Sequence, residues 1–222
     1  MAETWQAVDD YIAERLLGPD PALAAALAAN AAGGLPPIDV SAAQGRMLHL
    51  FARMLGARRV LEIGTLGGYS TICFARALGG GGGQVVTLEI DPHHAEVARG
   101  NIDAAGLGAI VDIRVGPAID SLKAMIAEGE AAFDLVFIDA DKQSNADYVR
   151  AALDLTRPGS AIIVDNVIRD GKVIDAASSD GMVQGTRRLY DYLHTEPRLD
   201  CTAVQTVGSK GWDGFMLALV KG

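Results

Sequence analysis

Cysteine is scarce in this chain of 222 residues, which contains only Cys73 and Cys201. Two cysteines are too few for a disulfide framework or for a metal site built from paired CxxC motifs. We therefore expect both side chains to be buried, reduced thiols in a reducing compartment, and we place the protein in the cytoplasm.

Positive charge and long apolar runs are also in short supply. The chain has 19 Lys and Arg against 28 Asp and Glu, a net charge of −9. A general nucleic-acid binder needs a basic face, and an anionic membrane surface attracts basic segments. The longest uncharged stretch, residues 21–38, contains Gly33-Gly34 and Pro36-Pro37, which would break a membrane-spanning helix. Neither nucleic acid nor a membrane is an expected partner.

What is present is typical of a globular α/β protein. Half of the residues are apolar and 21% are charged, and the length fits one domain. Three helices are expected at the start. Apolar residues recur at helical intervals over residues 5–16, Asp20-Pro21 marks a second helix start, and Ser41 with Gln44 forms a capping box before residues 42–55.

Short apolar segments then alternate with helical ones. Strands are expected at residues 59–63, 84–90, 110–115, 133–139 and 161–165. Helices are expected between and after them at residues 69–78, 92–105, 119–127, 145–155 and 182–193. Strands that are apolar throughout are covered on both faces, and this alternation predicts a doubly wound sheet. Two further strands, 202–207 and 215–220, are separated by a turn at 208–214, so the last strand should be antiparallel. The prediction is a seven-stranded sheet with helices on both faces.

A glycine-rich turn follows the first predicted strand and opens a helix. Ligands bind at this edge of doubly wound sheets, where glycine allows close approach to the backbone. The spacing of Gly64, Gly67 and Gly68 is not the GxGxxG of dinucleotide sites, and Glu62 would repel phosphate but suit a cationic ligand. The alternative is a tight turn with no ligand. Glu89 ends the next strand, where a carboxylate can bind ribose hydroxyls; the alternative is a solvated strand end.

Acidic residues also end two later strands. Asp139, Asp141 and Lys142 follow one strand, and Asp165 and Asn166 end the next. Carboxylate and amide oxygens are hard ligands suited to Mg²⁺, and like charges would repel one another there without a cation. The alternative is that each aspartate caps a helix or a loop.

These motifs resemble those of a known enzyme family. The chain is similar, from about Ile38 to Lys221, to the metal-dependent, S-adenosylmethionine-using O-methyltransferases of the catechol and caffeoyl-CoA type, in their short bacterial form. The motifs that carry the resemblance are VLEIGTLGGYS, TLEIDP, GPA, FDLVFIDADK, GSAIIVDN and GSKGWDGF. The resemblance implies the Rossmann-like fold of class I methyltransferases.

The resemblance also implies roles for individual residues. The expected cofactor contacts are Val40, Glu62, Gly64, Thr65, Ser70, Glu89, Ala118, Asp139 and Asp141. The expected metal ligands are Asp139, Asp165 and Asn166, for Mg²⁺ first and Mn²⁺ or Ca²⁺ as alternatives. Lys142, beside Asp139, matches the lysine proposed to deprotonate the acceptor hydroxyl. Asp170 stands where plant enzymes place a substrate-contacting Asn, and Trp212 replaces a Tyr, so both are expected to line the acceptor site.

The expected activity is methyl transfer from S-adenosylmethionine to a hydroxyl of a catechol-like small molecule, assisted by a divalent cation. Residues 1–40 would form an N-terminal helical lid segment and residues 41–222 the cofactor-binding and catalytic core of a single domain. One alternative is a nicotinamide-dependent oxidoreductase, which the missing GxGxxG disfavours. Another is a non-catalytic S-adenosylmethionine-binding protein, which the complete set of metal ligands disfavours. We also expect a homodimer, from the resemblance and from an apolar N-terminal segment that carries Trp5 and Tyr11.

Overall fold

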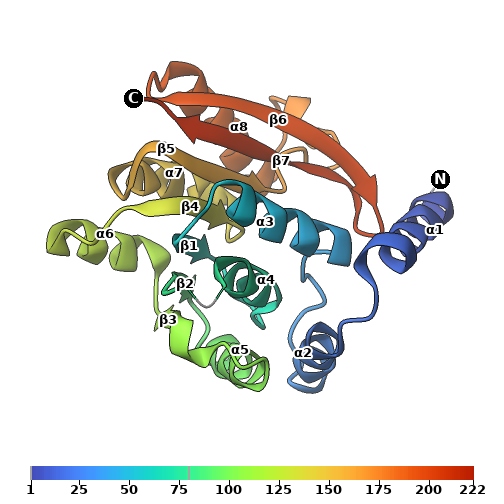
Figure 1. Ribbon diagram of the computed structural model, residues 1–222. Helices are drawn as coiled ribbons and strands as arrows, with labels where there is room; N and C mark the ends of the chain where they lie inside the picture. The colour runs from blue at the N-terminus through green and yellow to red at the C-terminus, as the bar shows by residue number, and fades with distance from the viewer. Residues whose placement is uncertain (1, 80) are drawn as a thin grey trace.

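The computed structural model describes residues 2–79 and 81–222, and a seven-stranded sheet lies at its centre (Figure 1). The strand order is β3-β2-β1-β4-β5-β7-β6. The strands are β1 (Arg59–Ile63), β2 (Gln84–Glu89), β3 (Val111–Val115), β4 (Phe133–Ile138), β5 (Thr156–Asp165), β6 (Leu199–Gly208) and β7 (Gly211–Val220). β1 to β5 are parallel, and β7 runs antiparallel between β5 and β6. The predicted fold is confirmed.

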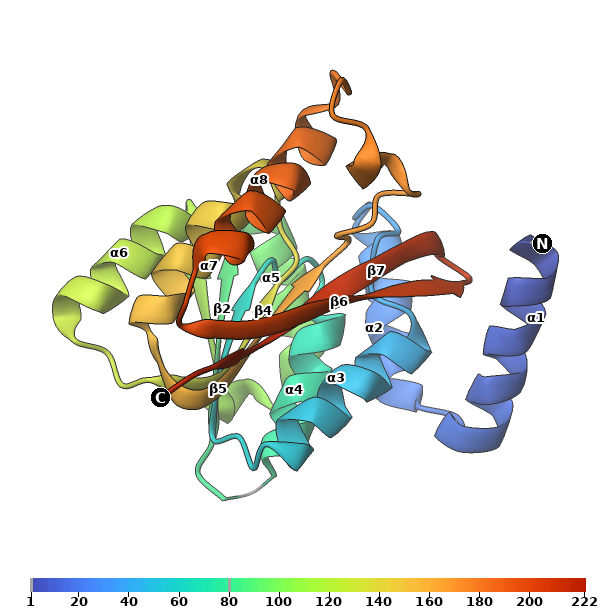
Figure 2. The same ribbon diagram turned by 90° about the horizontal axis from the view of Figure 1, so that it is seen from above.

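Helices cover both faces of the sheet (Figures 1 and 2). The α-helices are α1 (Ala2–Ile12), α2 (Pro21–Ala32), α3 (Ala42–Met54), α4 (Tyr69–Leu78), α5 (Pro92–Ala104), α6 (Ala118–Glu128), α7 (Asn145–Asp154) and α8 (Gly181–Thr195). Short helices of other types are η1 (Ala13–Leu17), η2 (Gly108–Ile110), η3 (Lys142–Ser144) and η4 (Lys172–Ile174). α2 to α5 pack on one face around Val60, and α6 to α8 pack on the other around Leu61. Consecutive residues of the central strands thus enter opposite cores, which is why β4 and the second half of β5 are apolar almost throughout.

The carboxyl-terminal hairpin differs from the prediction. β6 extends to Gly208 and β7 begins at Gly211, so only two residues link the strands where a turn over 208–214 was expected. Gly214 lies within β7. The position requires glycine, because a Cβ there would stand 2.1 Å from the Val204 carbonyl oxygen of β6. Gly214, which was expected to be part of a long turn, therefore allows close strand contact instead. β5 also begins five residues earlier than expected, at Thr156.

The N-terminal helices are attached in two different ways. α1 stands away from the rest of the chain, beside the tip of the β6–β7 hairpin, where Asp9 accepts a hydrogen bond from the Ser209 amide at 2.7 Å (Figures 1 and 2). α2 is part of the main core, since Ala26 and Asn30 are buried. That residues 1–40 act as a lid stays a prediction.

Two expectations about exposure and membranes also meet the structure. Both cysteines are free, but only Cys73 is buried; Cys201 is exposed, so the expectation that it is buried was wrong. Cys201 lies on β6, the strand at the edge of the sheet. Within residues 2–79 and 81–222, no helix has the length and apolar character that crossing a bilayer requires.

Candidate active site

The ends of β1 and β4 meet at the predicted ligand edge of the sheet. The Asp139 amide donates a hydrogen bond to the Ile63 carbonyl at 2.8 Å. Gly64 has a φ of 101°, and a Cβ there would lie 2.1 Å from the carbonyl oxygen of Asp139. Only glycine fits at this point, so Gly64 allows the glycine-rich turn to lie directly against Asp139 and the residues that follow β4.

Glu62 is buried in a network of hydroxyl groups. Its carboxylate is 0% exposed and accepts hydrogen bonds from Ser70 at 2.6 Å, from Thr87 at 2.7 Å and from the Thr71 hydroxyl. Burial raises the pKa of Glu62 to about 7, and the three hydroxyl donors oppose that rise. The carboxylate therefore fixes Ser70 at the start of α4. Its expected contact with the cofactor stays a prediction, as does that of Ser70.

Glu89 braces the glycine-rich turn from the end of β2. One carboxylate oxygen accepts the amides of Thr65 at 3.1 Å and Leu66 at 2.8 Å, and the other accepts the Asp91 amide at 3.0 Å. The two bonds from Thr65 and Leu66 hold Leu66 in the left-handed region, at a φ of 48°. A carboxylate offers about four lone-pair sites, so capacity for a further donor remains. Ribose binding by Glu89 stays a prediction.

α2 contributes a buried asparagine to the same turn. A Cβ on Gly67 would stand 1.9 Å from the Oδ1 atom of Asn30, so this glycine is also sterically required. Asn101 donates to both Asn30 Oδ1 and the Gly67 carbonyl at 2.9 Å, and Asn30 donates to Asp39 at 2.9 Å. Sequence reasoning missed this network, whose only sign was a lone amide in an alanine-rich helix.

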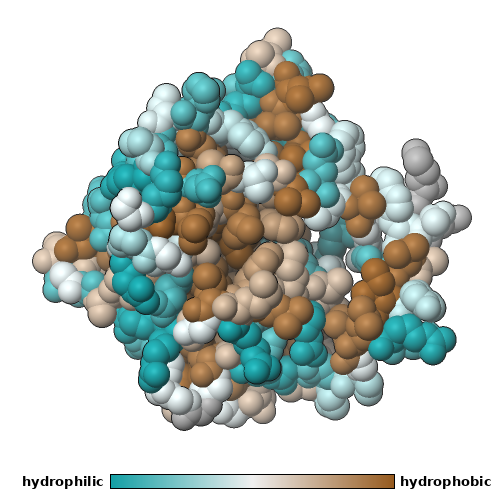
Figure 3. Space-filling view, turned by 45° about the horizontal axis from the view of Figure 1, so that its top comes forward, coloured by the Kyte–Doolittle hydropathy of each residue, from teal (hydrophilic) through white to brown (hydrophobic). Residues whose placement is uncertain are grey.

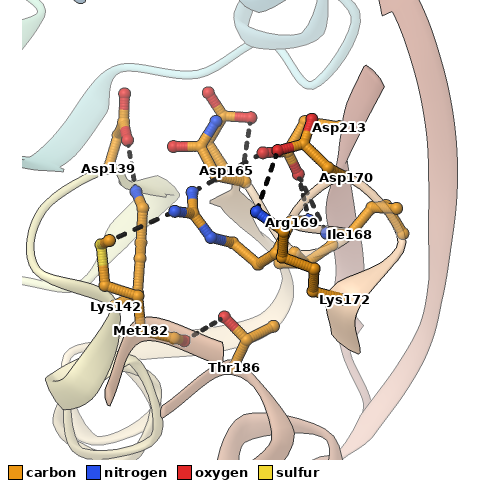
Figure 4. Close-up of polar contacts among 12 residues, drawn as sticks. Asp139, Lys142, Asp165, Ile168, Arg169, Asp170, Lys172, Met182, Thr186 and Asp213 are labelled. Atoms are coloured by element: carbon orange, nitrogen blue, oxygen red, sulfur yellow. Dashed lines mark hydrogen bonds and ion pairs between the residues drawn. The ribbon is translucent and has the colours of Figure 1, made fainter. Parts of the chain in front are cut away.

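The acidic residues after β4 and β5 come together with Lys142 (Figure 4). Lys142 is buried and its Nζ atom donates to Asp139 Oδ1 at 2.6 Å. Its backbone is pinned by α8, since a Cβ on Gly185 would lie 2.3 Å from the Lys142 carbonyl oxygen. Asp165 is buried at the end of β5, and burial together with the Asp139 charge raises the pKa of its carboxyl.

Gln44 reaches this group from α3. Its backbone amide donates to Ser41 Oγ at 3.2 Å, which confirms the cap. The predicted reciprocal bond was wrong, because the Gln44 side chain instead donates to Asp165 Oδ2 at 2.7 Å. The other oxygen of Asp165 accepts the Asn166 amide at 2.9 Å. Gln44 thus orients a predicted metal ligand from 121 residues away in the sequence.

The donor set has the chemistry of a hard-cation site. No three carboxylate, imidazole or thiol side chains gather at metal-binding range within the described residues. The expected set differs from such a triplet because it has two carboxylates, Asp139 and Asp165, and the amide oxygen of Asn166. Burial, and after it the charge of Asp139, raises the pKa of Asp165, and a divalent cation held by the two carboxylates would relieve their mutual repulsion. The residues fit a divalent cation with oxygen ligands.

The other expected cofactor contacts lie around this edge. Val40 is buried just before α3, and Ala118 is the half-buried first residue of α6. Asp141 is exposed, and its carboxylate accepts hydrogen bonds from the Ser144 amide at 3.2 Å and from the Tyr148 hydroxyl. Asp141 therefore caps η3, as the capping alternative for the aspartates expected. The cofactor roles of all three residues stay predictions.

Asp170 and Trp212, the two residues expected to line the site of the methyl acceptor, meet at the loop after β5. Asp170 lies in this loop, and Trp212 packs on it from β7. The Asp170 side chain is 68% exposed, and its nearest cation is the Lys172 ammonium at 3.8 Å. The Trp212 ring packs over Gly171, where a Cβ would stand 2.6 Å from it, and its Nε1 atom donates to Gln205 at 3.1 Å. Their acceptor contacts stay predictions.

Comparison with known proteins decides the family. A model of the O-methyltransferase family matches residues 21–220. The chain belongs to the O-methyltransferase family. It is 54% identical to a catechol O-methyltransferase of Mycobacterium tuberculosis, over 96% of this chain and 95% of that protein. It is 49% identical to a catechol O-methyltransferase of Niastella koreensis, over 99% of each chain.

A solved structure supports the same assignment. The O-methyltransferase from Bacillus cereus, solved in complex with SAH, is 53% identical, covers 100% of each chain and superposes with a TM-score of 0.97. The protein described by the present structure is therefore an S-adenosylmethionine-dependent O-methyltransferase, and the predicted enzyme class is confirmed. The alternatives of a nicotinamide-dependent oxidoreductase and a non-catalytic binding protein are thereby set aside.

Proposed function

We propose that this O-methyltransferase transfers the methyl group of S-adenosylmethionine to one hydroxyl of a catechol-like, vicinal diphenol, with the help of a divalent cation. The observation that carries the proposal is the cluster of Asp139, Lys142 and Asp165 at the sheet edge, directly against the glycine-rich turn. Two close relatives that bear the name catechol O-methyltransferase support the acceptor class.

The cofactor would bind along the ends of β1 and β2. Its sulfonium group makes the methyl carbon electrophilic, and its positive charge suits an edge that carries Glu62 and Glu89. Glu89 keeps lone-pair capacity for the ribose hydroxyls, and Gly64 leaves room for close approach to the backbone. We expect this half of the site to bind the cofactor without a metal.

The acceptor would bind over the ends of β4 and β5. Asp139, Asp165 and Asn166 would hold a divalent cation, Mg²⁺ first, whose charge favours ionisation of a neighbouring hydroxyl. Lys142 would accept the phenolic proton at Nζ as a general base in its neutral amine form, which requires that the ammonium now paired with Asp139 first release a proton to solvent. The phenolic oxygen then forms a bond to the methyl carbon as the carbon–sulfur bond breaks, and no covalent enzyme intermediate is needed.

Positioning supplies much of the expected rate. The sheet edge fixes the groups that would hold donor and acceptor, because β1 and β4 touch at Gly64 and Asp139. Holding two reactants in line in this way supplies up to about 7–11 kcal/mol in favourable cases. Lys142 and Asp165 are buried, so little reorganisation is required of them.

The test compares the three isomers of dihydroxybenzene as acceptors, with S-adenosylmethionine and Mg²⁺. The 1,2 isomer should be methylated, and the 1,3 and 1,4 isomers should react at least about tenfold more slowly, because only adjacent hydroxyls present two oxygens to one cation. Excess chelator should remove the activity. Equal rates for the three isomers, or full activity in chelator, would contradict the proposal.

We further propose that the enzyme is a homodimer in the cytoplasm. Support for dimerisation comes from α1 and η1. These helices contact little of the rest of the chain, so their apolar side chains Val8, Tyr11 and Leu16 are left exposed. Figure 3 shows hydrophobic side chains along this N-terminal segment, at the right of the view. Light scattering should give twice the monomer mass; a monomer mass independent of concentration would contradict the proposal. A reducing compartment suits the exposed, free Cys201, and cell fractionation tests this location.

A further inference from the structure

Arg169 lies on a strained loop that leaves the candidate active site. Asn166, Arg169 and Asp170 all have left-handed backbones, with φ values of 58°, 57° and 54°. Non-glycine residues adopt this region at a cost, so their surroundings must hold them there. Asp213 does so from β7, because its Oδ1 atom accepts the amides of Ile168 at 2.9 Å and Arg169 at 3.0 Å.

The guanidinium of Arg169 has no good oxygen acceptor. Its side chain is 22% exposed, and its Nε atom is buried and without a hydrogen-bond partner among the described residues. One terminal nitrogen stands 3.7 Å from Asp213 Oδ2, beyond hydrogen-bond range, and the other donates to the sulfur of Met182 at 3.6 Å. Sulfur is a weak acceptor, and a largely buried cation with five N–H donors is costly without oxygen partners.

The Arg169 side chain points from the loop toward the cluster of Asp139, Lys142 and Asp165. Figure 4 shows it extending from the loop past Asp165 toward Met182 and Lys142. Met182 lies in the first turn of α8, which packs on the Lys142 segment through Gly181 and Gly185. The guanidinium, whose only oxygen partner among the described residues is Asp213 at ion-pair distance, therefore lies beside the cluster of Asp139, Lys142 and Asp165, where the acceptor would bind.

We propose that Arg169 binds a carboxylate substituent of the acceptor, so that catechols bearing a carboxylate are the preferred substrates. This inference rests on the proposed function. The planar fork of a guanidinium matches the two oxygens of a carboxylate, and such an ion would satisfy the donors that the protein leaves free. The carboxylate of the cofactor is a poor candidate, because the contacts expected for the methionine end of the cofactor, Glu62, Gly64, Thr65 and Ser70, lie at the glycine-rich turn.

The test measures kcat/KM for 3,4-dihydroxybenzoate and for the uncharged 3,4-dihydroxybenzamide. Arg169→Met should lower the value for the acid by about ten- to a hundredfold, mainly through KM, and leave the amide within about twofold. Arg169→Lys should restore part of the loss, because it keeps the charge but not the fork. Lys172→Met is the matched control, since Lys172 is an exposed cation of the same loop and should leave the acid-to-amide ratio unchanged.

The outcomes distinguish a failure of the proposed role of Arg169 from a failure of the proposed function. Equal losses for acid and amide in Arg169→Met would overturn the inference and assign Arg169 a structural role with Asp213; Arg169→Lys decides the same point if the Met variant does not fold. A wild-type enzyme that methylates both acceptors without preferring the acid would also overturn it, with the proposed function intact. A wild-type enzyme that methylates neither would overturn the proposed function itself.

Discussion

The two halves of the candidate site differ in how completely their polar groups are paired. At the ends of β1 and β2, Glu62 and Glu89 each accept three hydrogen bonds from the protein. At the ends of β4 and β5, the Asp139 carboxylate has one hydrogen-bond partner, Lys142, and the Arg169 guanidinium has no oxygen within hydrogen-bond range among the described residues. Asp165, which accepts from Gln44 and from the Asn166 amide, is the exception in this half.

This difference indicates a division of labour. The cofactor half is preorganised, and a preorganised site loses less conformational entropy when its ligand binds. The acceptor half carries charges that the proposed cation and the proposed anionic acceptor would neutralise. The account therefore predicts that substitutions in the acceptor half change turnover, whereas substitutions in the cofactor half change cofactor affinity or stability.

The largest effect is expected for Asp139→Ala. Loss of a metal ligand removes several kcal/mol of charge stabilisation from the reaction, so turnover should fall by about 10³-fold or more. Asp154→Ala, at an exposed carboxylate just before the start of β5 and so at the opposite end of that strand from Asp165, is the control and should retain full activity. Methylation of a catechol at the wild-type rate by Asp139→Ala would refute the metal role.

Lys142→Met should slow the reaction by about 10²–10⁴-fold, the usual contribution of a general base. Part of the rate should return as the pH rises, because the acceptor hydroxyl then ionises without help. Rate constants measured under saturating substrate across a pH series check this. If the variant is as fast as the wild type at neutral pH, Lys142 is only an electrostatic neighbour of the site, and the cation alone suffices.

Glu62→Gln should change the pH dependence of stability. The folded enzyme, with a Glu62 pKa of about 7, holds a proton that the unfolded chain, with a pKa of 4.5, has released. The free energy of unfolding should therefore fall by up to about 3 kcal/mol as the pH rises from 4.5 to 7. Urea unfolding without cofactor should show this slope in the wild type and a flatter slope in the variant. Identical slopes would mean that Glu62 titrates normally.

Glu89→Ala should have the smallest effect of the four, and it should fall on the cofactor. Charge-assisted hydrogen bonds contribute about 1.5–3 kcal/mol each, so S-adenosylmethionine should bind about ten- to a hundredfold more weakly by calorimetry. KM for the acceptor should change little. Glu96→Ala, at an exposed position on α5, is the control. Unchanged cofactor affinity in Glu89→Ala would remove Glu89 from the cofactor site.

The sequence predicted the sheet because local signals determine it. Apolar runs such as residues 133–138 enter both cores, and the cap at Asp20 starts a helix as expected. Gly64 was predicted as a ligand-side glycine. Its steric need appears only in three dimensions, where a Cβ would meet Asp139.

Other parts of the site depend on contacts that the sequence does not reveal. The side chain of Gln44 was assigned to a local capping box, but its partner Asp165 lies on another element. The direction of the Arg169 side chain depends on the left-handed backbone at this position. The sequence gives no sign of that backbone, because the residue there is neither glycine nor asparagine. Gly214 indicated a turn because close strand contact and tight turns both favour glycine.

Calorimetry of S-adenosylmethionine binding tests the division between the two halves most directly. The dissociation constant would be measured for the wild type with Mg²⁺, for the wild type in excess chelator and for Asp165→Ala, beside the methylation rate of a catechol in each case. We predict that the dissociation constant stays within about threefold, or 0.7 kcal/mol, while both perturbations abolish methylation. Cofactor affinity that falls in step with methylation would contradict the account.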